Sequence, residues 1–161
     1  MRSRGLVTGV SLLALALAGS ARARPSIRSD FFARYTGAVN TQLDNLPSNA
    51  GHCGVCHYDF DGSGPRNFYG EAVKLRRDQG MSNAQAFAAL EGVDSDGDGH
   101  TNLVEITSMV YSNTPTFPGL SQANKSSTLH VLLADIEPYL TPITAPNPNS
   151  PPSLNRVEAL T

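Results

Sequence analysis

The sequence has few cysteines, since Cys53 and Cys56 are the two present in 161 residues. Small exported proteins that depend on disulfides for their stability usually carry more, so a disulfide-rich scaffold is excluded. Long apolar runs are equally scarce. Outside residues 6–19, no segment approaches the roughly 20 apolar residues that a membrane-spanning helix needs. A protein with several membrane spans is therefore excluded as well.

The apolar run at residues 6–19 belongs to an amino-terminal segment with the features of a secretory signal peptide. Two arginines precede the run, and Ala21-Arg22-Ala23 follows it with the small-x-small pattern of a cleavage site. Because the run is too short to span a bilayer, we expect residues 1–23 to be removed as a signal peptide. The mature chain is then expected in the periplasm or outside the cell.

Acidic residues outnumber basic residues in the expected mature chain. Removal of residues 1–23 takes three arginines from the 12 Lys and Arg, which leaves 9 against 14 Asp and Glu and a net charge near −5. Surfaces that bind nucleic acids are basic, because they neutralise phosphate groups. We therefore expect no nucleic-acid partner.

Apolar residues recur at helical spacing along most of residues 27–137, whereas strand signals are weak. Ser82 and Gln85 form a capping-box pattern, Gly80 is expected to end one helix, and Pro47 and Pro138 are expected to stop two others. The pattern predicts helices at 27–46, 71–79, 82–92, 102–111 and 127–137. The expected fold is mainly α, with one domain at residues 24–140 and a flexible Pro-rich tail at residues 141–161.

Residues 53–57, Cys-Gly-Val-Cys-His, fit the CxxCH pattern of c-type haem attachment. Two thiols at this spacing reach the two vinyl groups on one haem edge, and His57 would bind the iron as the proximal ligand. Three alternatives stay open. A redox dithiol normally follows a strand, a zinc site needs a fourth ligand, and a disulfide between Cys53 and Cys56 would close a very small loop. We expect haem c, with Tyr58 and Tyr69 beside an exposed haem edge.

The sixth ligand of the haem iron is open between Met109, Met81, His130 and a vacant position. Two protein ligands favour electron transfer, whereas a vacant position permits peroxide chemistry or gas sensing. We expect an electron carrier that works with redox partner proteins rather than an enzyme, and peroxidase activity remains the alternative. The sequence contains no convincing nucleophile and base pair for a hydrolase.

Residues 94–105 fit the twelve-residue calcium loop of an EF-hand. The oxygen ligands expected at positions 1, 3, 5, 7, 9 and 12 come from Asp94, Asp96, Asp98, the backbone carbonyl of His100, Asn102 and Glu105. Only one such loop is present, so we expect a structural ion and not a paired sensor. Exported proteins need only weak sites, with a Kd on the order of 10⁻⁴ to 10⁻³ M. Asp59 and Asp61 suggest a second cation site, but isolated aspartates in a turn are the favoured interpretation.

The segment Gly62-Ser63-Gly64-Pro65-Arg66-Asn67-Phe68-Tyr69-Gly70 resembles the loop that follows CxxCH in class I c-type cytochromes. This resemblance implies a small cytochrome c-like helical domain. It also implies that the carbonyl of Pro65 accepts a hydrogen bond from His57, which would orient the imidazole ring.

The order of the motifs, with Thr-Phe-Pro-Gly at residues 116–119 after the calcium loop, resembles a group of exported bacterial monohaem cytochromes and thrombospondin type 3-like calcium proteins. The calcium half also resembles the temptin family, whose members carry no haem. That second resemblance implies an alternative function. In it the chain is a secreted calcium-binding interaction module, and Cys53 and Cys56 form a disulfide.

Overall fold

The computed structural model describes residues 25–49, 53–107 and 114–140. Within these ranges the chain is helical, and strand pairing is limited to isolated bridges. The α-helices are α1 (Pro25–Arg34), α2 (Phe68–Asp78), α3 (Asn83–Leu90), α4 (Asn102–Ile106) and α5 (Leu133–Ile136). The 3₁₀ turns are η1 (Thr36–Ala38), η2 (Lys125–Ser127) and η3 (Glu137–Tyr139). The expectation of a mainly α fold is confirmed.

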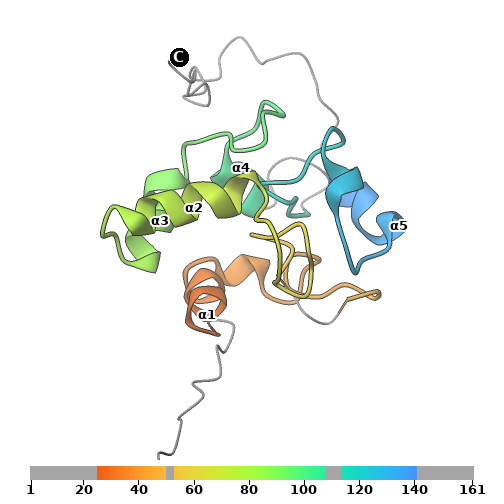
Figure 1. The fold of residues 1–161 in the computed structure, drawn as a ribbon, viewed down its shortest axis with the longest axis horizontal. Helices are drawn as coiled ribbons and strands as arrows, with labels where there is room; N and C mark the ends of the chain where they lie inside the picture. Colours follow the sequence, from red (N-terminus) through yellow and green to blue (C-terminus); the bar gives the residue numbers. More distant parts are fainter. Residues whose placement is uncertain (1–24, 50–52, 108–113, 141–161) are drawn as a thin grey trace, which may run out of the picture.

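The core lies where α1, α2 and α3 meet. Figure 1 shows α2 and α3 together on one side of the molecule, with α1 below them and α5 at the opposite end. The ring of Phe31 from α1 packs edge-on against Tyr69 of α2 and Phe87 of α3, with centroid distances of 6.2 and 5.6 Å. All three rings are buried, so aromatic packing joins the three helices.

Local sequence signals account for the ends of α2 and α3. The side chain of Asn67 caps α2 by accepting a hydrogen bond from the backbone N–H of Gly70. Beyond the other end, Gly80 adopts a φ of 90°, which suits glycine. Ser82 and Gln85 form both hydrogen bonds of the expected capping box at the start of α3. These two helices are confirmed, and α2 begins three residues earlier than the apolar pattern predicts.

The single helix expected at residues 27–46 is wrong, because α1 ends at Arg34. Tyr35 leaves the helical region with φ −109° and ψ 67°. Its ring packs against Phe87 of α3 with a centroid distance of 6.4 Å, and its hydroxyl donates to Glu91 at 3.2 Å. Farther on, Asn40 has a φ of 61° and donates its backbone N–H to the carboxylate of Asp44. Tertiary packing of Tyr35 therefore outweighs the helical spacing of the apolar residues, and Val39 is left exposed.

The helix expected at residues 127–137 is also wrong. His130 interrupts it with a φ of 56°. The neighbouring Leu129 instead pairs with the cysteine region, because its N–H donates to the carbonyl of Tyr58 and its carbonyl accepts from the N–H of Phe60. Pro138 does not stop the helical conformation, because it lies in the first turn of η3.

Several expectations lie outside the described residues. They include the signal peptide at residues 1–23, the end of the helix expected at 102–111, the candidate iron ligand Met109, and the tail at 141–161. In the described part of the chain, no helix has both the length and the apolar character needed to span a membrane.

Candidate functional site

The loop between α3 and α4 gathers three carboxylates. One oxygen each of Asp94, Asp96 and Asp98 lies within 4.8 Å of the others. The backbone folds around Asp94, whose two carboxylate oxygens accept the N–H groups of Gly97 and Gly99 at 2.8 and 2.9 Å. Both glycines have positive φ, 77° and 97°, which permits a tight turn at this part of the loop.

Besides the hydroxyl of Ser95, four side-chain oxygens of this loop are buried and have no hydrogen-bond partner among the described residues. They are Oδ2 of Asp96, Oδ2 of Asp98, Oδ1 of Asn102 and Oε2 of Glu105. The last three residues are 0% exposed. Buried polar atoms are nearly always paired, and an unpaired buried carboxylate is costly. The structure therefore brings together oxygens at positions 3, 5, 9 and 12 of the expected calcium loop and leaves them without a counter-charge.

Asn102 and Glu105 are oriented by contacts outside the loop. The Asn102 side-chain amide donates to the carbonyl of Leu90 at 2.7 Å, which turns its unpaired oxygen away from that contact. Glu105 receives a hydrogen bond from the hydroxyl of Thr116 at 3.1 Å, and its backbone carbonyl accepts the N–H of the same threonine at 2.9 Å. Thr116 was not singled out from the sequence as a supporting residue.

The pKa values of two carboxyl groups in the loop are raised, which also indicates that a positive charge is lacking there. Burial, followed by the charges of Asp98 and Asp94, raises the pKa of Asp96 to about 8. Burial, followed by the charges of Asp96 and Asp98, raises the pKa of Glu105 well above its usual value. These groups need either protons or a cation at neutral pH. His100 donates its backbone N–H to Asp98 at 2.9 Å, and its expected role as a carbonyl ligand stays a prediction.

Cys53, Cys56 and His57 share one tight turn. The carbonyl of Cys53 accepts the backbone N–H groups of Cys56 and His57 at 3.1 and 3.0 Å. The two cysteines, both in the described part of the chain, are not joined by a disulfide. Burial raises the pKa of Cys56 to about 12, and the nearby Cys53 adds to this effect. Both thiols are therefore protonated at neutral pH, since burial also raises the pKa of Cys53.

The imidazole of His57 is half-buried. Burial is the main cause that lowers its pKa, and the charge of Arg66 acts in the same direction. Its Nδ1 atom is buried and has no hydrogen-bond partner in the described ranges. The carbonyl of Pro65 instead accepts the backbone N–H of Tyr58 at 3.3 Å. A carbonyl oxygen has two lone pairs, so the role implied for Pro65 stays a prediction.

Asn67 holds this turn against α2. Its buried amide donates to the carbonyls of Gly54 and Val55 at 2.9 and 3.1 Å, and its backbone N–H donates to the carbonyl of Cys56 at 3.1 Å. The helix and the turn approach so closely that a Cβ atom at Gly70 would overlap the Cys56 carbonyl. The role of Asn67 is not apparent from the sequence, because its partners become visible only when the chain is folded.

A small hollow lies on the Gly54 side of the turn. It is open to solvent, its empty space of about 160 Å³ includes the solvent at its mouth, and it is lined by residues 42–46 together with Asn49, Gly54 and Phe60. Its enclosed part has no room even for a water molecule, so a haem does not fit into this hollow. Two further expectations near the turn have different outcomes. Tyr69 is fully buried and cannot border an exposed haem edge, while Tyr58 is half-buried. Met81 packs against the hydrophobic core.

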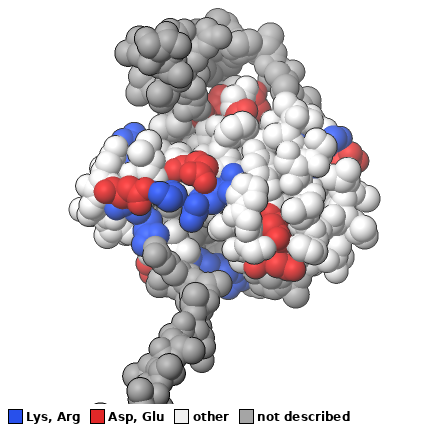
Figure 2. Space-filling model, viewed as in Figure 1, with Lys and Arg blue, Asp and Glu red and all other residues white. Residues whose placement is uncertain are grey.

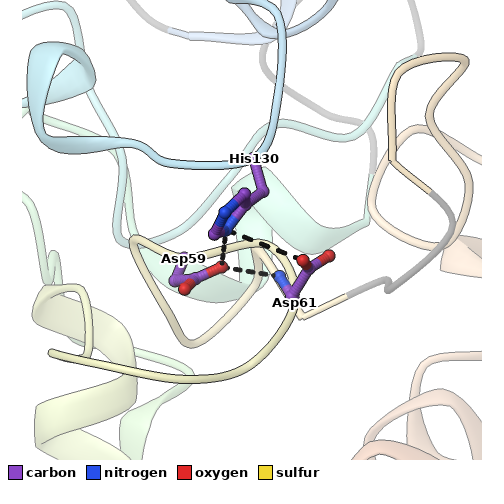
Figure 3. Close-up of side chains that lie close together, drawn as sticks. All are labelled: Asp59, Asp61 and His130. Carbon is purple, nitrogen blue, oxygen red and sulfur yellow. Dashed lines mark hydrogen bonds and ion pairs between the residues drawn. The ribbon is translucent and has the colours of Figure 1, made fainter.

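A second cluster joins Asp59, Asp61 and His130 (Figure 3). His130 Nδ1 lies 2.8 Å from Oδ1 of Asp59 and 3.6 Å from Oδ2 of Asp61. The carboxylate of Asp59 is already satisfied, because its two oxygens also accept the N–H of Asp61 at 2.9 Å and the hydroxyl of Ser63 at 2.5 Å. In contrast to the carboxylates of the 94–105 loop, the two carboxylates of this cluster have a basic side chain beside them. We interpret it as a contact that holds residues 129–131 to the cysteine region.

The contact between His130 and Asp59 is expected to depend on pH. The hydrogen bond to Asp59 raises the pKa of His130, and hydrogen bonds from Ser63 and then His130 lower the pKa of Asp59 to about 2. The contribution of His130 to the stability of the fold is therefore complete below pH 6.5, and it is lost as the pH rises through the raised pKa of His130. The contribution of Asp59 to the stability of the fold is present above pH 3.8, and it is lost as the pH falls towards 2.

We expect His130→Gln to destabilise the protein more at about pH 5.5 than at about pH 9, where the parent histidine is neutral. Chemical denaturation of parent and variant at both pH values measures this difference. An equal loss of unfolding free energy at both values would show that the imidazole charge plays no part.

Basic and acidic side chains are mixed on one face of the molecule. Figure 2 shows Lys and Arg beside Asp and Glu over the region of α1 and α2. The ion pairs of the protein include Arg34–Glu91 and Lys74–Asp78. The face shown in Figure 2 has no continuous basic surface of the kind that binds phosphate backbones.

Comparisons with known proteins give no relative from which a function follows. No protein-family model, no curated protein and no solved structure matches the chain.

Proposed function

We propose that this protein is an exported, calcium-stabilised electron carrier with one haem c attached covalently at Cys53 and Cys56. The observation that carries the calcium part is the set of four buried, unpaired oxygens at residues 96, 98, 102 and 105. The haem part rests on the turn that holds two thiols and one imidazole together.

Calcium suits the loop because its ligands are hard oxygens. Ca²⁺ takes six to eight oxygen ligands, mainly from carboxylates, carbonyls and water. Asp94, Asp96, Asp98, Asn102 and Glu105 offer oxygens of this kind, and no thiol or imidazole nitrogen belongs to the cluster. A softer metal such as zinc favours sulfur and nitrogen ligands. We therefore assign this loop to Ca²⁺, with the backbone carbonyl of His100 as the expected further ligand.

The residues of the cysteine turn are chemically suited to hold haem c. Cys53 and Cys56 supply two thiols, and His57 supplies an imidazole whose Nδ1 still lacks a partner. A haem bound there supplies a one-electron redox centre. The part played by the chain is to orient these three side chains, and Asn67 does so by binding the carbonyls of Gly54 and Val55. Electron transfer with redox partner proteins follows from this proposal.

The haem-free calcium module remains a second candidate, and the 160 Å³ hollow favours it. In this candidate the buried thiols of Cys53 and Cys56 act only in packing or in a short disulfide, and the calcium loop is unchanged.

Production of the full chain in an exporting host, with and without a haem c maturation system, separates the two candidates. We expect the first host to give red protein, with the α-band of a c-type haem, a mass increased by one haem and pigment that resists acid-acetone extraction. The double variant Cys53→Ser/Cys56→Ser should be colourless, whereas Ser126→Ala, at an exposed position, should stay red. Protein of bare polypeptide mass from a competent host would leave the calcium module as the function.

A further inference from the structure

Residues 114–121 lie between the proposed calcium loop and the cysteine turn. This segment includes the Thr-Phe-Pro-Gly motif at 116–119, to which the proposed function gives no role. Residues 115–121 are all buried. Buried loop segments are unusual because their backbone polar groups must find partners inside the protein. The partners of this segment belong to both sites.

On the calcium side, the contact is made by Thr116. Its hydroxyl donates to Glu105 Oε1, and its N–H donates to the Glu105 carbonyl. The other oxygen of that carboxylate is one of the four unpaired oxygens. The same side chain is thus shared between the proposed ion and the 116–119 segment.

On the cysteine side, two contacts end at Gly54. The ring of Phe117 packs edge-on against Phe60 with a centroid distance of 5.7 Å. Phe60 packs so tightly on Gly54 that a Cβ atom there would overlap its ring, and the carbonyl of Phe60 accepts the N–H of Cys53 at 3.1 Å.

The second contact runs through Asn67. Gly119 lies so close to Asn67 that a Cβ atom there would overlap the Asn67 side-chain oxygen. The amide of Asn67 in turn binds the carbonyls of Gly54 and Val55. Residues 117 and 119 therefore both support the loop that carries the thiols.

We propose that calcium binding controls how tightly the cysteine turn is closed, through Glu105, Thr116 and the 116–119 segment. This inference rests on the proposed calcium site. Without the ion, the fully buried Glu105 carboxylate is uncompensated, and its return to water withdraws the hydrogen bond that Thr116 makes. The segment then loses its anchor, and Phe117 and Gly119 no longer press on Phe60 and Asn67. Calcium thus sets the access of haem or oxidants to Cys53 and Cys56.

Hydrogen exchange of the full chain, followed by mass spectrometry, tests this link whether or not haem is attached. Removal of calcium with EGTA should speed the exchange of the amides at residues 53–70 by about tenfold, the effect expected for loss of a charge-assisted hydrogen bond. The amides of α1 should change much less. Calorimetric titration of the same sample with CaCl₂ measures binding of the ion itself.

A matched pair of variants tests whether the link between the calcium loop and the cysteine turn runs through Thr116. Thr116→Val keeps the shape but removes the hydroxyl that binds Glu105, and it should speed exchange at residues 53–70 even at saturating calcium. Thr107→Val removes a hydroxyl that donates to the Leu103 carbonyl at 2.6 Å, and it should leave residues 53–70 unchanged.

The outcomes are distinguishable. Absence of calcium binding in the titration would overturn both the proposed calcium site and the link. Binding without faster exchange at residues 53–70 after EGTA would overturn the link alone. An equal rise in exchange across α1 and residues 53–70 would also overturn it, because the ion would then hold the whole fold and not this route. So would a Thr116→Val protein that exchanges like the parent at saturating calcium.

Discussion

Removal of calcium with EGTA is expected to lower the free energy of unfolding by about 3 kcal/mol, relative to protein in calcium at about 100 times its Kd. The physical reason is the group of buried carboxylates at Asp96, Asp98 and Glu105, whose repulsion only a cation or protons relieve. Guanidinium denaturation curves in calcium and in EGTA measure the difference. Coincident curves would contradict a structural ion at this loop.

The variant Glu105→Gln should separate the charge of this residue from its shape. Glutamine keeps the size and still accepts a hydrogen bond from Thr116, but it removes the bidentate negative ligand. In calcium, we expect the variant to be less stable than the parent by about 3 kcal/mol, because it no longer gains the stabilisation from the ion. In EGTA, we expect it to be at least as stable as the parent, because a buried charge has been removed.

The order of stability of the parent and the Glu105→Gln variant is thus expected to reverse between calcium and EGTA. Glu137→Gln is a matched control, since Glu137 is exposed and pairs with Lys125 at the surface. Exposed ion pairs contribute little to stability, so the control should follow the parent in both buffers. A Glu105→Gln protein that keeps the full calcium-dependent stabilisation would place the ion elsewhere.

The variant Asn67→Ala is expected to lower the free energy of unfolding by about 4 kcal/mol, the second large effect. The substitution leaves the carbonyls of Gly54 and Val55 and the N–H of Gly70 buried without their partner. Each buried group that loses its hydrogen bond costs about 1 to 3 kcal/mol. Denaturation at saturating calcium measures the effect separately from the ion.

Asn45→Ala is the matched control for this variant, because Asn45 is exposed and its truncation should change stability by less than about 0.5 kcal/mol. If Asn67→Ala lost no more than the control, Asn67 would not be the residue that holds the cysteine turn against α2. A loss of stability with unchanged exposure of Cys53 would instead show that its main role is to cap the helix.

Local sequence signals predicted the parts of the fold that depend on neighbouring residues. The capping box of Ser82 and Gln85 and the glycine after α2 have partners within a few positions, and both are present as expected. The carboxylates of Asp94, Asp96 and Asp98 are likewise close in the chain, and the structure brings them together.

Contacts between distant residues account for the errors. The expected helix at 27–46 is cut short where Tyr35 turns into the aromatic core, and the one at 127–137 is interrupted where His130 meets Asp59. The helical spacing of apolar residues does not reveal either of these contacts. The same limit explains why Asn67 and Thr116 received no role, since their partners lie 11 to 13 residues away along the chain. Buried polar residues of this kind are identified only by their hydrogen bonds.

The three glycines at Gly54, Gly70 and Gly119 have a consequence for the order in which the protein can fold. Each lies where another residue leaves no room for a methyl group: the Phe60 ring at Gly54, the Cys56 carbonyl at Gly70 and the Asn67 side chain at Gly119. The three positions span 66 residues of sequence (119 − 54 + 1). Contacts between distant residues form late, because the intervening chain must first be brought together. A nascent polypeptide therefore cannot complete its core until residue 119 has left the ribosome, and premature termination upstream of it would yield a chain that stays open.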